Sequence, residues 1–517
     1  MPSLREGEAV ALRRSLASPP DLVSLYAHLS DGGRRADTIL LERSAGPSFL
    51  LDQAAVRAEC RGQSVVLTAL GEGGRNVLSA IARRLAARVA MRSVDAIELR
   101  FPPVAGDDSE ARLLAPSPLD ALRALTGLTS RSPEEAATLM AMGVFAFDHA
   151  DLFERLPPAR EDPLDFPDYV FWLAESLIVA EPGAKPRLVC TAFGAEDEGA
   201  SRRAYFAAAE RLARLVSRCE GAIQVTPPAT VSAPPAGPEP EVDLDDEAYG
   251  AIVSSLRERI VAGDVYQIVP SRTFRAACPD PMASYLALRR LDPSPYQFFV
   301  AAGRHMLFGA SPETAVRVFR RDRSPMVEVK PIAGTRARGA TDDEDDRLEA
   351  EMRLDTKETA EHMMLVDLAR NDVARVSRPG TRRLEGLMVV ERYARVMHLV
   401  SSVTGVLRTG LDSLHALQAC LNMGTLTGAP KIRATELLRR TERTKRGPYG
   451  GAVGWLDGDG MLDTGVVIRS AVVRDGIAFV RAGAGVVYDS DPQLEADETR
   501  RKASALLSVL AATGAAT

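Results

Sequence analysis

The chain has 517 residues, 46% of them hydrophobic, and a formal net charge of −6. This length allows roughly two or three domains with sizeable cores, and the mild acidity argues against a nucleic-acid-binding protein, which would carry a basic stripe. The five scattered cysteines include no CxxC pair, no apolar run reaches membrane-spanning length, and the first residues lack the apolar segment of a signal peptide. We therefore expect a cytoplasmic protein that binds neither nucleic acid nor a membrane.

Residues 1–225 mix strand-like and helix-like segments. Alternating or continuous apolar runs at 64–70 and 169–180 predict strands, and the stretch rich in Ala, Leu and Arg at 76–90 is typical of a helix. Residues 226–247, TPPATVSAPPAGPEPEVDLDDE, hold too much proline for a helix or a central strand and end in acids. We predict an N-terminal α+β region, 1–225, followed by a linker, 226–247.

Residues 248–510 form the second predicted region. In chain order the sequence predicts a helix at 249–263, a strand at 264–274, a long acidic helix at about 341–376, a strand at 397–407, and glycine-punctuated strands from 450 to 487. Helices and strands follow no regular βαβ period, which favours an α+β fold with large antiparallel or mixed sheets flanked by helices. The glycine clusters at 71–74 and 483–485 match neither phosphate-loop pattern.

Two pairs of glutamates are the most informative feature of the second region. Glu358 with Glu361, and Glu495 with Glu498, are three residues apart, a spacing that places both carboxylates on one face of a helix. A solvated acidic helix face is the alternative for any one such pair. Hard oxygen donors on two helices suit Mg²⁺, which keeps part of its water and accepts further oxygen ligands.

A series of motifs in the second region resembles the chorismate-utilising enzymes. The segments, in order, are PIAGTRARG (331–339), MLVDLARNDVARV (364–376), VMHLVSSVTG (396–405), GTLTGAPKIRA (424–434), YGGAVGW (449–455), LDTGVVIRSAVV (462–473) and AGAGVVYDSDPQLEADETRRKA (482–503). Within that family the chain is most similar to large subunits of anthranilate synthases, and TILLERSA, RFPPV, GVFAFDHADLFERLP and DYVFWLAESLIVA extend the resemblance to the N-terminal half. The resemblance implies the family's fold for nearly the whole chain.

The resemblance also implies where chorismate and magnesium bind. Mg²⁺ would be held by Glu361 and Glu498, supported by Glu358 and Glu495. The chorismate contacts implied are Gly334, Thr335, Tyr449, Arg469 and the backbone amides of Gly483, Ala484 and Gly485. An arginine fork suits a carboxylate, and glycines allow close approach of the main chain. From the pattern alone, Arg469 could instead face solvent on an exposed strand, and Gly334 could belong to a simple turn.

Three further residues are implied to act in catalysis. Glu313 would be the general acid that protonates the leaving C4 hydroxyl, which requires a raised pKa. His398 would serve the later loss of pyruvate, and Thr425 would hydrogen-bond the substrate. The alternatives are a helix N-terminus at 311–313, a core histidine, and a capping threonine.

Two positions separate the chain from other members of the family. Isochorismate and salicylate synthases have a water-activating lysine where this chain has Gln267, and an amide is not basic. Aminodeoxychorismate synthases have a nucleophilic lysine where this chain has Ala333. The resemblance therefore implies that chorismate and ammonia are converted through aminodeoxyisochorismate to anthranilate and pyruvate, in the first step of tryptophan biosynthesis. Release of aminodeoxyisochorismate, and a catalytically silent amino-acid-sensing subunit, are the alternatives.

The resemblance further implies a partner and a regulator. No GxCxGxQ-like nucleophile motif is present, so ammonia is expected from a glutamine amidotransferase small subunit. Feedback inhibition by tryptophan would make residues 1–225 regulatory. The implied tryptophan contacts are Glu42, Ser44, Pro295, Tyr296 and Gln297. Arg43 and Gln297 depart from the family's pattern at this site and leave the strength of inhibition open.

Overall fold

The computed structural model describes residues 4–16, 21–106, 108–158, 161–221, 239–393 and 396–514, with only the backbone described at Thr335 and Lys357. The helices are α1 (Leu22–Leu29), α2 (Glu72–Arg84), α3 (Ser109–Leu114), α4 (Leu119–Thr126), α5 (Glu198–Glu220), α6 (Asp246–Val261), α7 (Pro281–Leu291), α8 (Asp342–Leu354), α9 (Thr356–Val376), α10 (Ser413–Cys420), α11 (Lys431–Thr441) and α12 (Pro492–Gly514). Short 3₁₀ helices are η1 (Ala86–Arg88), η2 (Ala136–Leu139) and η3 (Phe147–Leu152). Among these described helices, none combines the length and the apolar character needed to cross a membrane.

The strands of the N-terminal half are β1 (Glu8–Ser15), β2 (Thr38–Arg43), β3 (Ser48–Arg61), β4 (Ser64–Ala69), β5 (Val89–Arg92), β6 (Ala96–Arg100), β7 (Thr129–Ser130), β8 (Ala141–Phe145), β9 (Tyr169–Ala180) and β10 (Arg187–Phe193). Those that follow are β11 (Glu241–Val242), β12 (Gln267–Ile268), β13 (Ser271–Ala277), β14 (Tyr296–Ala302), β15 (His305–Ser311), β16 (Thr314–Arg321), β17 (Ser324–Val329), β18 (Ile332–Ala337), β19 (Arg383–Arg392), β20 (Val396–Val406), β21 (Gly428–Ala429), β22 (Ala452–Leu456), β23 (Leu462–Val466), β24 (Ser470–Arg474) and β25 (Ile477–Gly483).

Strands from both halves of the chain pair in one mainly antiparallel network with two arms. The first arm runs from β3 through β2, β14, β15, β24, β25 and β13 to β11. The second runs from β9 through β8, β22, β23, β16 and β17 to β20, which pairs with β18 and β19. Because β3 pairs with β9, the arms share a root. The antiparallel α+β architecture agrees with the fold class expected from the sequence.

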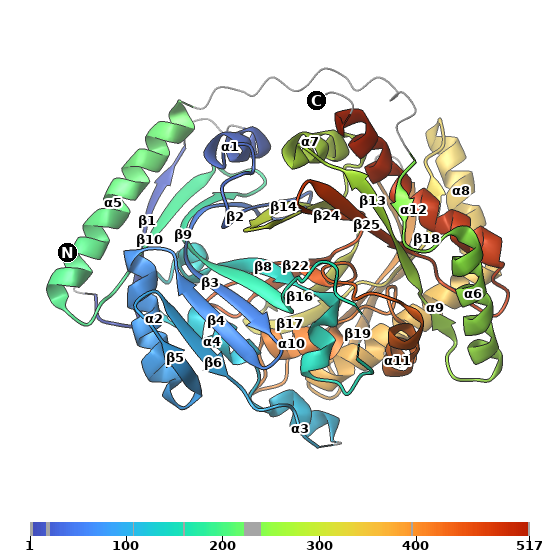
Figure 1. Ribbon diagram of the computed structural model, residues 1–517, viewed down its shortest axis with the longest axis horizontal. Helices are drawn as coiled ribbons and strands as arrows, with labels where there is room; N and C mark the ends of the chain where they lie inside the picture. The colour runs from blue at the N-terminus through green and yellow to red at the C-terminus, as the bar shows by residue number, and fades with distance from the viewer. Residues whose placement is uncertain are drawn as a thin grey trace.

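The two arms face each other across an apolar layer, and helices cover their outer sides. Ile39 and Phe298 from the first arm pack in one cluster with Val144 and Val453 from the second. Helices α1, α7 and α12 cover the first arm, and α9 and α10 cover the second. In Figure 1 the strands occupy the middle, with α1, α7 and α12 along the upper edge and α10 and α11 below.

The predicted linker lies only partly within the described residues. Residues 222–238 are outside them. Within 239–247, β11 pairs with β13 and Asp245 caps α6 by accepting a hydrogen bond from the backbone N–H of Ala248. This end of the linker segment is therefore folded against the C-terminal region.

Two predicted elements are interrupted. The acidic helix expected at 341–376 is two helices, because Asp355 leaves the helical conformation and its carboxylate accepts the Glu358 backbone N–H over 3.0 Å. The strand expected at 264–274 breaks at Pro270, which has no N–H to donate to a ladder. Its first part, β12, pairs with β21 instead of the main network.

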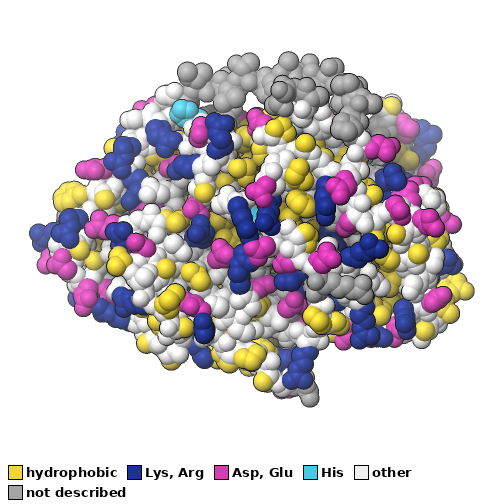
Figure 2. All heavy atoms as spheres, viewed as in Figure 1, with side chains coloured by type: hydrophobic (Ala, Val, Ile, Leu, Met, Phe, Trp, Pro, Cys, Tyr) yellow, Lys and Arg dark blue, Asp and Glu magenta, His cyan; other side chains and the backbone are white. Residues whose placement is uncertain are grey.

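Charged side chains of both signs are interleaved over the visible face of the molecule in Figure 2. On this face Lys and Arg lie among Asp and Glu rather than in one continuous basic stripe. Many of these groups are paired, as in the ion pair of Arg321 with Glu385. Such exposed pairs contribute little stability individually.

Candidate active site

A buried carboxyl group lies between β15 and β16. Glu313 is only 5% exposed, and its carbonyl oxygen accepts the Val466 N–H over 2.9 Å. The Thr425 hydroxyl donates to Glu313 Oε1 over 2.6 Å. Burial raises the pKa of Glu313 to about 7, although Thr425, Lys502 and Arg469 oppose the shift. The side chain therefore holds a proton near neutral pH, which a general acid requires.

A buried histidine lies across the ladder from the glycine of the PIAGT motif. His398 in β20 is opposite Thr335 in β18, and its Nδ1 is 3.2 Å from the carbonyl oxygen of Gly334. A carbonyl only accepts, so Nδ1 carries the hydrogen and Nε2 is the basic nitrogen. Burial lowers the pKa of His398, which keeps the imidazole neutral. Gly334 has a φ of +62° beside a register shift, so the turn requires glycine.

The first acid pair lies next to this histidine strand. Glu358 and Glu361 are in the first two turns of α9, a helix that packs on β18 and β20. Arg336 in β18 donates a short hydrogen bond to Glu358 Oε1. Glu358 Oε2 is buried without a hydrogen-bond partner in the described part of the chain. A Cβ placed on Gly334 would lie 3.0 Å from that oxygen.

The second acid pair begins α12. Glu495 is 8% exposed, whereas Glu498 is more exposed and forms an ion pair with Lys502 over 2.7 Å. Lys502 Nζ also donates to the carbonyl oxygen of Gly483 over 3.0 Å. Lys502 is not among the residues that the sequence motifs predicted for the site. Its spacing of four residues from Glu498 on a predicted helix was the available signal.

The donor set of the two pairs fits magnesium. All four groups are carboxylates, and no group among the described residues donates a hydrogen bond to Glu358 Oε2. Over the residues that the structure describes, no three His, Cys, Asp or Glu side chains form a ready-made metal cluster. Mg²⁺ does not need one, because it commonly binds through one or two carboxylates and keeps several waters.

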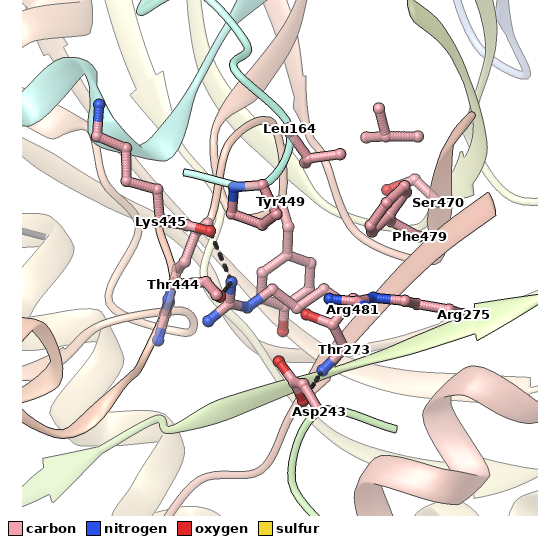
Figure 3. A pocket seen from close by; sticks show the side chains of 13 residues that line it. Leu164, Asp243, Thr273, Arg275, Thr444, Lys445, Tyr449, Ser470, Phe479 and Arg481 are labelled. Carbon is pink, nitrogen blue, oxygen red and sulfur yellow. Dashed lines mark hydrogen bonds between the residues drawn. The ribbon is translucent and has the colours of Figure 1, made fainter. Parts of the chain in front are cut away.

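The residues predicted to bind a carboxylate lie at strand ends and in loops of both arms. Arg469 is not inside a strand, as the sequence pattern suggested, but between β23 and β24 with a φ of +46°. This backbone turn brings Arg469 Nη1 within 3.3 Å of Asp292 Oδ2, so the guanidinium does not face open solvent on a sheet surface. Tyr449 is buried, and its hydroxyl lies close to Gly483. Figure 3 shows Tyr449 beside Arg481 at the wall of a small cavity.

The glycine segment 483–485 meets Gln267. The Ala484 N–H donates to the carbonyl oxygen of Pro270 over 3.3 Å, and a Cβ on Gly485 would come within 2.7 Å of Gln267 Nε2. Gln267 is 7% exposed, and its Oε1 is buried without a hydrogen-bond partner among the described residues. The structure thus brings Gln267 to Gly485, Pro270 to Ala484, and Tyr449 to Gly483.

The residues implied for tryptophan lie at a different place, where β2 pairs with β14, but their side chains are divided between the two faces of the sheet. Tyr296 faces the apolar layer between the arms, whereas Glu42 and Gln297 face α7. Glu42 is opposite Gln297, and the Ser44 N–H donates to the carbonyl oxygen of Pro295 over 3.1 Å. Glu42 already accepts hydrogen bonds from Tyr285 and Arg289. The remaining implied contact is Tyr296, which lies opposite Arg43.

Arg43 fills a space that we call the Arg43 slot, which is bounded by Tyr296, Trp455 and Asp463. Its guanidinium lies 3.9 Å above the centre of the Tyr296 ring and 3.3 Å from Asp463 Oδ1. The cavity left between these side chains is only ≈ 10 Å³. That is about the room needed for one water molecule, not for an indole.

Fold and site together define a chorismate-binding protein: the chain belongs to the family of chorismate-binding enzymes, whose model matches residues 84–508. It is 48% identical to the pyocyanine-specific anthranilate synthase component 1 of Pseudomonas aeruginosa, over 91% of this chain and 88% of that protein. It is 44% identical to anthranilate synthase component 1 of Vibrio cholerae, over 96% of both chains. The crystal structure of anthranilate synthase component I from Streptococcus pneumoniae matches with a TM-score of 0.66 at 28% identity, over 90% of this chain and 93% of that one.

Proposed function

We propose that this chain is the chorismate-converting component of an anthranilate synthase. The observation that carries the proposal is the buried Glu313, held by Thr425 with a pKa of about 7, in a member of the chorismate-binding family. Chorismate and ammonia would give aminodeoxyisochorismate and water, and that intermediate would give anthranilate and pyruvate. No other reactant is needed to balance either step.

In the first step Glu313 acts as the acid. Thr425 donates to Oε1, which leaves Oε2 to carry the acidic proton. That proton goes to the C4 hydroxyl as it leaves as water, while the ammonia lone pair forms the bond to C2. Gln267 Oε1, a buried acceptor with no hydrogen-bond partner in the described ranges, can accept an N–H of ammonia and orient its lone pair. An amide cannot deprotonate water, so an amine that needs no deprotonation is favoured.

In the second step His398 acts as the base. Its neutral imidazole, fixed by Gly334 at Nδ1, presents Nε2 to accept the proton from C2. Loss of that proton makes the ring aromatic as the C3–O bond breaks. The departing enolate then takes the proton from His398 at its methylene carbon and becomes pyruvate.

We further propose Mg²⁺ as the cofactor, held by Glu361 and Glu498 with Glu358 and Glu495 in support. When bound, the ion would neutralise the ring carboxylate of chorismate and orient it. Arg469 and Tyr449, with the backbone amides of 483–485, would bind the enolpyruvyl carboxylate. Gly334 and Thr335 complete the proposed substrate contacts.

The ammonia source is proposed to be a glutamine amidotransferase chain. Relatives of this chain are named component 1, which implies a second component in those enzymes. We place the reaction in a reducing cytoplasm, a setting supported by the five cysteines, all of which are buried free thiols.

Tryptophan is the least supported element of the proposal. A ligand in the Arg43 slot must displace the Arg43 guanidinium. The Glu42 carboxylate lies on the opposite face of the sheet, where Tyr285 and Arg289 already donate to it. We therefore propose that tryptophan inhibits this chain only weakly compared with a variant that lacks Arg43.

The test is incubation of the pure protein with chorismate, MgCl₂ and ammonium chloride at neutral and at alkaline pH, with products identified by fluorescence and mass. Anthranilate and pyruvate in equal amounts are expected, and Glu313→Gln should abolish chorismate consumption. Accumulation of aminodeoxyisochorismate alone would support the releasing enzyme instead. Unchanged chorismate would support the silent subunit and refute the proposal.

A further inference from the structure

A buried ionic cluster lies beneath the segments proposed to bind chorismate. Glu442, the residue that ends α11, is 7% exposed. Its carboxylate accepts hydrogen bonds from the N–H and hydroxyl of Ser271 at 2.9 and 2.8 Å. It also accepts two from Arg446, at 2.9 and 2.6 Å, and one from Arg481 at 3.1 Å. The Glu442 carboxylate therefore joins three separate segments of the chain.

The two arginines extend the cluster to the backbone around it. Arg446 donates to the carbonyl oxygens of Leu426 at 2.5 Å and Val269 at 2.7 Å. Arg481 donates to the Ser271 hydroxyl at 2.8 Å and to the carbonyl oxygen of Lys445 at 2.8 Å. Figure 3 shows the last bond, with Arg481 lying next to Tyr449.

Four of the proposed active-site residues lie one to three residues along the chain from a side chain of the cluster or from a carbonyl group that it binds. Leu426 follows Thr425, whose hydroxyl holds Glu313. Val269 is two residues after Gln267, and Arg481 is two residues before Gly483 on β25.

Tyr449 is the fourth of these proposed active-site residues. It is three residues after Arg446, whose guanidinium lies 5.9 Å from the centre of its ring. The spacing among all four sites is thus set through one carboxylate, that of Glu442.

Fold stability alone does not account for this arrangement. Burying one carboxylate and two guanidiniums carries a large desolvation cost, and well-packed apolar side chains of similar size generally stabilise a core as well or better. The charged side chains instead fix the geometry of their surroundings, because each planar guanidinium holds several hydrogen-bond acceptors in set directions.

We infer that Glu442 is a positioning residue of the active site. Through Arg446 and Arg481 it sets the separation between the Thr425 loop, Tyr449 and the glycine segment 483–485. The inference rests on the proposed function, because it assigns the cluster to chorismate binding. Neither Glu442 nor either arginine touches the reacting atoms. Loss of the cluster should therefore weaken chorismate binding more than it lowers the rate of the bound complex.

The test compares two variants with a matched control. Glu442→Gln keeps the size of the side chain and removes its charge, and Ser271→Ala removes one hydroxyl that both donates to Glu442 and accepts from Arg481. Glu175→Gln is the control, because Glu175 is equally buried and pairs with Arg211 at 3.0 Å in the N-terminal half. For each, KM and kcat are measured with ammonium, chorismate affinity is measured by calorimetry without ammonium, and Tm is recorded.

We expect KM and Kd for chorismate to rise by about tenfold or more in Glu442→Gln, and by a few-fold in Ser271→Ala at wild-type Tm. Glu175→Gln should lower Tm and leave KM unchanged. If Glu442→Gln fails to fold, Ser271→Ala decides. Wild-type KM and Kd in the folded variants, or an equal rise in the control, would overturn the inference. Failure of wild-type protein to form anthranilate would instead overturn the proposed function.

Discussion

Replacement of Arg43 by serine should open the Arg43 slot to tryptophan. In the structure the Arg43 guanidinium stacks on Tyr296 and pairs with Asp463. The Arg43 side chain is only 12% exposed and that of Asp463 only 8%. Tryptophan must break both interactions before it can occupy the slot. A partly desolvated cation–π contact contributes about 1–2 kcal/mol. The ion pair adds about 1 kcal/mol, since Asp463 keeps Arg317 and the Tyr296 hydroxyl.

Together these contacts oppose tryptophan by about 2–3 kcal/mol, which corresponds to roughly 30- to 150-fold in affinity. Calorimetric titration should therefore show tryptophan binding to Arg43→Ser tighter than to wild type by that factor. By linkage, chorismate with magnesium must weaken the binding if tryptophan inhibits. Arg57→Ser is the control, because Arg57 pairs with Asp37 near the other end of β2 and lies outside the slot. Equal affinities in wild type and Arg43→Ser, or the same gain in Arg57→Ser, would refute the reasoning.

Three other outcomes are expected. Because burial raises the pKa of Glu313 to about 7, its protonated form is lost as pH rises through that value. Chorismate consumption at a fixed concentration of un-ionised ammonia should fall above that pH, and a flat profile would exclude Glu313 as the acid. His398→Met should consume chorismate but accumulate aminodeoxyisochorismate, seen by mass; equal loss of both steps would contradict the assignment. Glu498→Gln should abolish turnover at saturating magnesium with Tm nearly unchanged, because it loses only an exposed pair with Lys502. An active Glu498→Gln would remove this metal assignment.

The parts of the fold that sequence could predict are those set by local pattern. The apolar run of β20 and the i, i+3 acid pairs on α9 and α12 depend on spacing along one element. The two breaks each depend on a single residue: Asp355 caps a helix, and Pro270 has no N–H to donate. Hydrophobic periodicity does not detect such single-residue effects.

The contacts within the sites depend on register between distant strands. Arg43 meets Tyr296 only because β2 pairs with β14 from the other half of the chain. The hydrogen bond of Lys502 to Gly483 likewise joins α12 to the end of β25. Motif resemblance selected the candidate residues of each site, but it carried no information on which partners those side chains contact.

The shared root of the two sheet arms has a consequence for how the molecule comes apart. Neither half of the chain forms a complete sheet by itself, because β2 pairs with β14 and β8 pairs with β22. Unfolding of the first half would strip hydrogen-bond partners and apolar cover from the second, so the two should melt in a single cooperative transition. A peptide bond cut within 226–238 should accordingly leave two fragments that remain associated and denature together, rather than two independently folded domains.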